Sequence, residues 1–320
     1  MNNRRCFIKK SILATAALTV PALPACVTIS TTTAKVPMRS GRVDRALVLW
    51  YSQTGHTRRC GEVLAAALAD KGIKVQAHDI REFKKQEKID FDLLVLGSPV
   101  FYYDTPGFVK NFIRSLPDLK GIPVASYVSF GGPEGNQDNA NYSILQLLSE
   151  KNGVPVGQKS FRSLSSFPLA WSTDTVHEKT WDARHLPDEQ TFQSVRNYAG
   201  FVLGQIKENH PGTFVKKLTL REASTMFGPE WWTKLLVKNH HIIEENCVRC
   251  NACVKLCPVN AIDLGQYHVD THACVMCFGC INTCEYQAIH MEYSKERVSG
   301  FKQFLEQHGI QPYLPPEVTL

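Results

Sequence analysis

The chain has 320 residues, of which 43% are apolar and 21% charged, a composition typical of a globular protein and not of a disordered one. Its formal net charge is +6, but Arg4, Arg5, Lys9 and Lys10 all precede Cys26, and the remaining chain holds 32 basic and 30 acidic residues. This balance gives no support for a polyanionic partner such as a nucleic acid.

The first 25 residues have the layout of an export signal. The basic stretch "NRRCFIKK" (Asn3–Lys10) precedes an apolar run from Ile12 to Val20 and then "LPAC", which ends at Cys26. The apolar run is much shorter than the ~20 residues that cross a bilayer as a helix. The basic stretch resembles the twin-arginine export motif, and "LPAC" resembles a lipobox. The resemblance implies export of a folded protein to the periplasm or the outer face of a membrane, with a lipid on Cys26. An ordinary Sec signal or an uncleaved anchor is the alternative.

Strands and helices are expected to alternate over the next 165 residues or so. Apolar runs that predict strands begin at Ala46, Ile73, Phe91, Ile122 and Val154. An alanine-rich helix is expected to end at Lys71–Gly72, and further helices are predicted over 105–115, 139–151 and 188–209. The alternation favours an α/β domain, a doubly wound parallel sheet covered on both faces, with ligands bound at the carboxyl ends of the strands.

The turn after the first strand, "SQTGHT" (Ser52–Thr57), has the chemistry of a phosphate site. It lacks the glycines of a dinucleotide-binding turn and the lysine of a nucleotide-triphosphate loop. It offers three hydroxyls and backbone N–H groups at a helix start, where the helix dipole favours a phosphate. The alternative is that these hydroxyls only cap the helix. The turn resembles the flavodoxin phosphate loop, which implies flavin mononucleotide (FMN) in a five-stranded sheet of order 2-1-3-4-5.

Two later loops follow the third and fourth predicted strands. They are "GSPVFYYDTPG" (Gly97–Gly107) and "SFGGPEG", and the resemblance implies that their aromatic residues and glycines approach the flavin ring. Ordinary core packing of the aromatic rings is the alternative. His56 is expected to be exposed, and Cys60 to be a small buried apolar residue. The candidate FMN-binding residues are Ser52, Gln53, Thr54, Gly55, His56, Thr57, Ser98, Pro99, Val100, Phe101, Tyr102, Phe130, Gly131 and Gly132.

Eight of the eleven cysteines form two matching runs, "CVRCNACVKLCP" and "CVMCFGCINTCE", which start 27 residues apart. In each C-x2-C-x2-C-x3-C run, three thiolates can hold one 4Fe-4S cluster while the fourth, on a helix expected to begin after it, reaches the other cluster. Structural zinc is the alternative, but it would leave the third cysteine of each run unused. The segment resembles a bacterial two-cluster ferredoxin, although Glu285 replaces the second proline. The expected ligand sets are Cys247, Cys250, Cys253 with Cys284, and Cys274, Cys277, Cys280 with Cys257.

The predicted organisation has six parts. They are a signal (1–25), a linker (26–44), a flavodoxin-like domain (45–209), a helical connector (210–242), a smaller α+β two-cluster domain (243–293) and a carboxyl-terminal helix with its tail (294–320). The connector concentrates apolar residues at Phe227, Trp231, Trp232, Leu235 and Leu236. These are expected either to pack the two domains together or to contact a membrane surface or a quinone.

Flavin and clusters together form a junction between one-electron and two-electron transfer. The leading hypothesis is therefore an electron carrier that links a redox protein or quinone to another redox protein. A flavin-dependent reductase of a small molecule such as a quinone, with the clusters as its relay, is the enzyme alternative, and a redox sensor is a third. The sequence nominates no catalytic acid or base.

Overall fold

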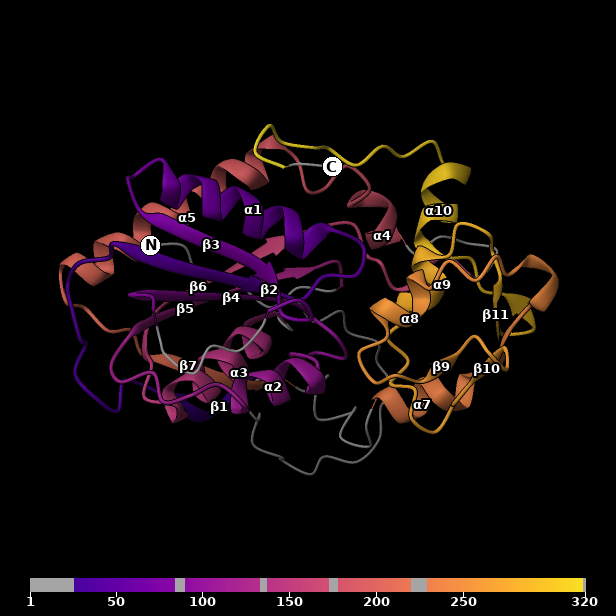
Figure 1. The fold of residues 1–320 in the computed structure, drawn as a ribbon, viewed down its shortest axis with the longest axis horizontal. Helices are drawn as coiled ribbons and strands as arrows, with labels where there is room; N and C mark the ends of the chain where they lie inside the picture. Colours follow the sequence, from indigo (N-terminus) through magenta and orange to yellow (C-terminus); the bar gives the residue numbers. More distant parts are fainter. Residues whose placement is uncertain (1–25, 84–89, 133–136, 173–177, 220–228, 319–320) are drawn as a thin grey trace, which may run out of the picture.

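A computed structural model of the chain describes residues 26–83, 90–132, 137–172, 178–219 and 229–318 (Figure 1). The predicted signal at 1–25 lies outside the described residues. Two units follow one another: a larger α/β unit and a smaller cysteine-rich unit (Figure 1).

The larger unit is built on a five-stranded parallel sheet of order β3-β2-β4-β5-β6, which confirms the predicted topology. Strands β2, β4 and β5 coincide closely with runs of buried residues, and β6 begins with one, whereas β3, at the edge of the sheet, alternates between exposed and half-buried residues. The strands are β2 (Arg45–Trp50), β3 (Lys74–Asp79), β4 (Leu93–Pro99), β5 (Pro123–Phe130) and β6 (Val154–Arg162).

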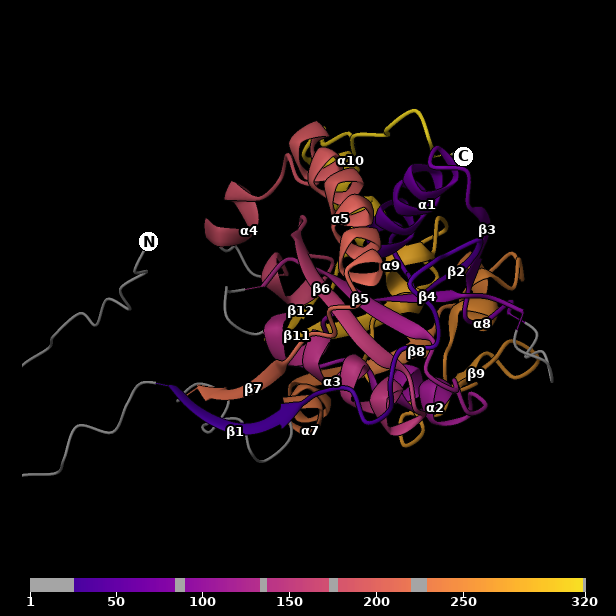
Figure 2. The ribbon, with the colours of Figure 1, turned by 90° about the vertical axis from the view of Figure 1, so that its left-hand side faces the viewer.

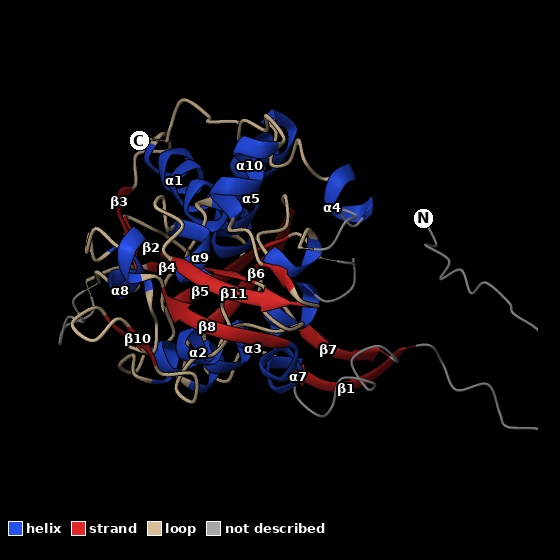
Figure 3. Ribbon diagram, turned by 90° about the vertical axis from the view of Figure 1, so that its right-hand side faces the viewer, coloured by secondary structure: helices blue, strands red, loops and turns tan. Residues whose placement is uncertain are grey.

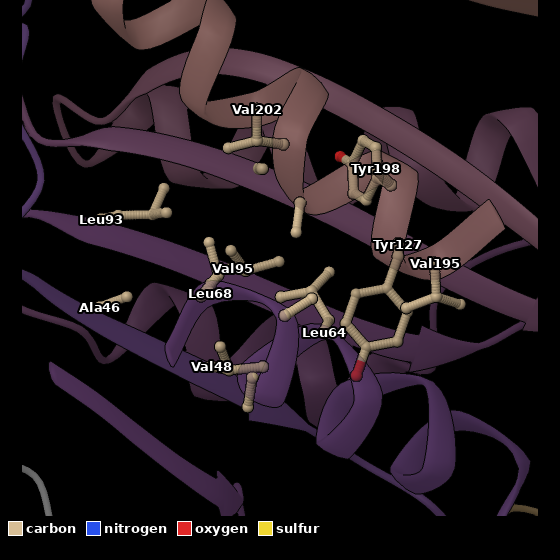
Figure 4. Packing of buried hydrophobic residues seen from close by; sticks show 14 of the residues in the cluster. Ala46, Val48, Leu64, Leu68, Leu93, Val95, Tyr127, Val195, Tyr198 and Val202 are labelled. Carbon is tan, nitrogen blue, oxygen red and sulfur yellow. The ribbon is translucent and has the colours of Figure 1, made fainter. Parts of the chain in front are cut away.

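Helices cover both faces of this sheet. On one face lie α1 (His56–Ala69) and α5 (Glu189–Lys207), and on the other lie α2 (Gly107–Arg114) and α3 (Gln137–Glu150) (Figure 1). Figure 4 shows the core of the first face, where Val48 of β2, Leu64 of α1 and Val202 of α5 converge. Cys60 is buried in the same core, as predicted, and burial raises the pKa of its thiol to about 12. The short elements η1 (Pro168–Ala170) and α4 (Glu178–Asp182) precede α5.

A strand pair joins the two regions that the sequence assigned to a linker and to a helical connector. Strand β1 (Cys26–Thr32) runs antiparallel to β7 (Phe214–Thr219), from Cys26 opposite Thr219 to Thr32 opposite Phe214 (Figure 2). The expected helix in the connector is α7 (Pro229–Leu236). The end of the predicted helical connector lies instead in strand β8 (Val237–Ile242). The helical prediction for 210–242 is thus correct for α7 only.

The smaller unit repeats one pattern twice. Helices α8 (Ala252–Leu256) and α9 (Gly279–Thr283) are each followed by a strand, β9 (Ile262–Asp263) and β11 (Ile289–Tyr293). Strand β11 lies between β8 and β12 (Glu296–Arg297), and β10 (His268–Val269) pairs with β9 (Figure 3). The turn η2 (Glu244–Asn246) precedes the first cysteine run, and α10 (Phe301–Gln307) is the predicted carboxyl-terminal helix.

Candidate functional site

Three loops meet at the carboxyl ends of β2, β4 and β5, as the sheet topology requires. The hydroxyl of Thr57, after β2, lies 2.7 Å from that of Ser129 at the end of β5. The N–H of Val100, after β4, donates to the carbonyl of Ser129 over 3.2 Å. Ser129 therefore connects all three loops, although the sequence analysis did not select it.

The turn Ser52–Thr57 leaves the amino terminus of α1 without a side-chain cap. Gly55 precedes the helix with φ +89°, a left-handed conformation that suits glycine, and its N–H donates to Ser52 Oγ over 3.2 Å. The first turn of α1 contains no acidic residue. Ser52 and Thr57 are buried, whereas Gln53, Thr54 and Gly55 are half-buried. The capping alternative is therefore wrong, and the N–H groups at this helix end suit a phosphate.

His56 is buried, contrary to the prediction that it is exposed. The Phe301 ring of α10 packs edge-on against its imidazole at 5.5 Å, and Arg59 donates from Nη2 to His56 Nδ1 over 2.8 Å. Burial, and then the Arg59 charge, lowers the pKa of His56 to about 3. Within the described residues, His56 Nε2 and Arg59 Nε are buried without a hydrogen-bond partner. Buried donors without partners beside this turn are consistent with a bound anion.

The neutral state of His56 leads to a prediction about pH. Its pKa falls from 6.5 when unfolded to about 3 when folded, so between these values the unfolded chain binds one proton more. Stability is therefore expected to fall as pH drops through this window, by up to about 1.4 kcal/mol per pH unit. In His56→Gln this contribution is absent. Urea midpoints of both proteins at about pH 7.5 and about pH 5.5 measure it, and equal losses in the two proteins would contradict the assignment.

The loop after β4 contains a strained turn. Phe101 and Asp104 exchange two backbone hydrogen bonds of 2.9 Å, and the residues between them, Tyr102 and Tyr103, have φ of 49° and 70°. Two left-handed residues form a type I′ turn, which costs non-glycine residues roughly 1–2 kcal/mol each. The Tyr102 hydroxyl donates to the carbonyl of Met276 over 2.8 Å, and Thr233 of α7 is a second partner. The turn is thus attached to the cysteine-rich unit.

The remaining candidate FMN-binding residues differ in how deeply they are buried. Ser98 is fully buried and its hydroxyl donates to the carbonyl of Pro99, while Pro99, Val100, Phe101 and Tyr102 are half-buried. Phe130 is buried at the end of β5.

The two glycines after β5 differ from each other. A Cβ at Gly131 would lie 2.3 Å from the Cα of Ser165, so packing within the protein already requires glycine there. A Cβ at Gly132 would meet no atom of the described residues within 4 Å, so these residues leave room for a ligand there.

The first group of cysteines, here named the outer set, surrounds one pocket. Cys247, Cys250, Cys253 and Cys284 all line it, with about 350 Å³ of empty space that includes space open to solvent. Cys250 is exposed, and Val248 and Tyr286 on the same pocket are exposed large side chains. Burial, together with repulsion from the three other sulfurs, raises the pKa of the Cys253 thiol to about 11. Four sulfurs that repel one another are expected to need positive charge among them, as iron supplies.

The second group, the inner set, consists of Cys274, Cys277, Cys280 and Cys257. Burial raises the pKa of the Cys277 thiol to about 11, with repulsion from Cys274 and Cys257. Cys280 Sγ lies 3.7 Å from Nε2 of His240, a neighbour that the sequence did not indicate. The helices α8 and α9 end before the fourth cysteine of each run, so the expected helix after it is absent from the described residues there.

The backbone around both sets follows the 27-residue repeat of the sequence. Left-handed residues occur at Arg249, Asn251 and Asn260 and again at Met276, Phe278 and Gln287. Backbone N–H groups donate to sulfur at equivalent places, from Ala261 to Cys257 and from Ala288 to Cys284, both over 3.2 Å. Such N–H donors and alternating backbone conformations are typical of iron–sulfur sites. Among the described residues, no three cysteine, histidine or carboxylate side chains are placed to hold a single metal ion.

The inner set lies directly against the phosphate turn. A Cβ at Gly279 would lie 2.9 Å from Gln53 Nε2 and 3.7 Å from Cys277 Sγ, so these two side chains are neighbours across the domain boundary. Gln53 also hydrogen-bonds to Cys277 and donates to the hydroxyl of Tyr51 over 3.1 Å. The Phe278 ring packs edge-on against Phe167 at 5.3 Å. The predicted flavin loops and the inner cysteines therefore form one continuous site.

Two family models match the chain at these places. The model described as a flavodoxin domain matches residues 47–161. These residues form a flavodoxin domain. The model described as a 4Fe-4S binding domain matches residues 240–263, a range that contains Cys247, Cys250, Cys253 and Cys257. The flavodoxin domain supports FMN as the ligand of the three loops, and the second match supports a 4Fe-4S cluster.

Several solved structures are similar to about half of the chain. A flavodoxin from the domain Archaea is 17% identical, covers 51% of this chain and 99% of its own, and has a TM-score of 0.38. Flavodoxin 1 from Bacillus cereus is 15% identical, with 50% and 97% covered and a TM-score of 0.38. Rubredoxin oxygen:oxidoreductase from Desulfovibrio gigas is 15% identical, with 52% and 37% covered and a TM-score of 0.37. No curated protein matches significantly. None of the described helices is long and apolar enough to cross a membrane.

Proposed function

We propose that the protein is an electron-transfer iron–sulfur flavoprotein with one FMN and two 4Fe-4S clusters. The observation that carries the proposal is the contact of Gln53, in the phosphate turn, with Cys277 and Gly279 of the inner set. A flavin accepts one or two electrons and a cluster accepts one. A flavin next to a cluster can therefore transfer electrons between a one-electron partner and a two-electron partner.

Residues of the flavodoxin domain have distinct roles in this proposal. Ser52, Thr54 and Thr57 supply hydroxyls, and the amino terminus of α1 supplies N–H groups, for the FMN phosphate. In this proposal the turn with Tyr102 and the backbone at Gly132 flank the flavin ring. Gln53 is the residue of the phosphate turn that contacts the inner cysteines, and it donates to Tyr51, which fixes its orientation.

The two cysteine sets differ in their access to solvent. The inner set lies against the flavodoxin domain, whereas the outer set reaches the surface at Cys250 and is bordered by the exposed side chains of Val248 and Tyr286. A redox protein or a quinone is therefore expected to exchange electrons with the chain near the outer set.

Cofactor analysis of anaerobically purified protein tests the proposal. About eight iron atoms, about eight sulfides and about one FMN are expected per chain, with the EPR spectrum of two interacting reduced clusters. Zinc in place of iron, or a colourless protein without flavin, would overturn it.

We propose further that the protein is exported folded and is lipid-anchored at Cys26. The support is the resemblance of Arg4–Arg5 and "LPAC" to the two signals, together with cofactors that are inserted before export. The double variant Arg4→Lys, Arg5→Lys is expected to accumulate cofactor-loaded protein in the cytoplasm. Cell fractionation measures this, with Lys9→Arg as a control that keeps the arginine pair. Normal export of the double variant would contradict the twin-arginine assignment.

A further inference from the structure

Helix α7 presents large apolar side chains to solvent. Trp231, Trp232, Leu235 and Leu236 have exposed fractions of 54%, 49%, 42% and 52%. The two indole rings contact each other at 5.0 Å in a perpendicular arrangement. Four exposed apolar residues on one eight-residue helix form a patch of a kind that marks an interaction surface. We call these four residues the α7 patch.

The other side of α7 is attached to the protein. Thr233 is buried and is a hydrogen-bond partner of Tyr102 in the flavodoxin domain. Lys234 donates to the carbonyl of His272 over 3.3 Å and pairs with Glu230 over 3.4 Å. The helix thus has a fixed orientation, and the expected packing role of the connector is fulfilled by this inner side without the α7 patch.

Helix α7 lies on the same side of the molecule as strand β1. Cys26, the first residue of β1, pairs with Thr219 of β7. Figures 1, 2 and 3 share their vertical axis, and in all three views β1 and α7 lie at the lower side of the molecule. A lipid carried by Cys26 would therefore enter a membrane on the side to which the α7 patch belongs.

The charges of β7, β8 and α7, which all lie in the lower part of the molecule (Figures 2 and 3), suit anionic lipid headgroups. Strands β7 and β8 and helix α7 together hold four lysines and one acidic residue, Glu230, which is paired with Lys234. The lysines are Lys216, Lys217, Lys234 and Lys238. Tryptophan next to lysine is the composition preferred at membrane–water interfaces, because the indole has an apolar body and one polar N–H group.

We propose that the α7 patch binds the surface of a lipid bilayer containing anionic headgroups, as a second attachment beside Cys26. The inference extends the proposed anchoring at Cys26. With two points of attachment the molecule has one preferred orientation on the bilayer, with the α7 patch and β1 towards the lipid.

Vesicle binding tests the proposal without the lipid anchor. The full-length chain with Cys26→Ala, loaded with flavin and iron, is mixed with vesicles of phosphatidylethanolamine and phosphatidylglycerol and separated by flotation. Binding is expected. The added substitutions Trp231→Ser and Trp232→Ser are expected to weaken it by on the order of tenfold or more, because two indole rings that would be buried in the bilayer are lost. The matched control is Phe201→Ser on α5, an equally exposed ring on the opposite face of the sheet, which is expected to bind unchanged.

Further measurements separate the possible outcomes. Leu236→Glu is expected to weaken binding as well, and its flavin and iron contents show whether the fold is intact. Absence of binding by the Cys26→Ala protein, or equal binding by the tryptophan variants, would overturn the proposal. A dimer in sedimentation that the tryptophan substitutions dissociate, without vesicle binding, would assign the α7 patch to a second copy of the chain and also overturn it. Normal cofactor content in any of these cases would leave the electron-transfer proposal intact.

Discussion

Replacing Cys277 with alanine is expected to remove the inner cluster and to cut the flavin off from reduction by a protein donor. Cys277 lies against Gln53 and among the other inner cysteines, so its loss removes a ligand at the contact with the phosphate turn. Iron is expected to fall from about eight to about four atoms per chain, since the outer set keeps its four cysteines. Flavin reduction by a reduced protein donor, followed by stopped-flow absorbance, is expected to fall to the background rate.

Two control variants test whether the effect is specific to the inner set. Cys60→Ala removes a buried cysteine in the core of the flavodoxin domain that belongs to neither set, and it is expected to retain all iron and normal flavin reduction. Cys250→Ala removes the exposed ligand of the outer set and is expected to retain the inner cluster. Full iron content in Cys277→Ala would show that the assignment of the ligands is wrong.

Replacing Thr57 with valine is expected to have the second largest effect, on FMN binding. Thr57 is buried at the start of α1, and its hydroxyl lies 2.7 Å from that of Ser129. Valine has the same shape but no hydroxyl, so the phosphate loses one charge-assisted hydrogen bond and Ser129 loses its partner. Such a loss costs about 1.5–3 kcal/mol, which weakens binding roughly tenfold to a hundredfold.

Fluorescence titration of the flavin-free protein with FMN measures this dissociation constant. Thr57→Ser keeps the hydroxyl and is expected to bind FMN within about threefold of the natural chain, because only a methyl group is lost. Unchanged binding by Thr57→Val would exclude this hydroxyl from the phosphate site.

The parallel sheet could be predicted because its strands are short runs of buried apolar residues separated by turns. Leu93–Leu96, for example, is fully buried, and a short apolar run between two predicted helices indicates a central strand of a parallel sheet. The pair β1–β7 was missed since its threonines and lysines alternate weakly, and its two strands are nearly 200 residues apart in the chain. Pairing over such a distance leaves no local signal.

The candidate site was predictable where local chemistry defines it and not where domain contacts do. The cysteine spacing and the hydroxyls of the phosphate turn are local, and the family matches support both cofactor types. The burial of His56 comes from Phe301, far along the chain, so a polar histidine in a turn was interpreted as exposed. The contact of Gln53 with Cys277 likewise depends on how the units pack, which no local pattern encodes.

The turn at Tyr102 and Tyr103 has a consequence for evolution. Its unfavourable backbone is held in place by hydrogen bonds from Tyr102 to the carbonyl of Met276 and to Thr233, both outside the flavodoxin domain. The two family matches lie in separate parts of the sequence, but these hydrogen bonds join the two parts in the folded chain. Exchange of one part for that of a distant homologue would release the tyrosines and reshape the proposed flavin site, so the two parts are expected to change in concert.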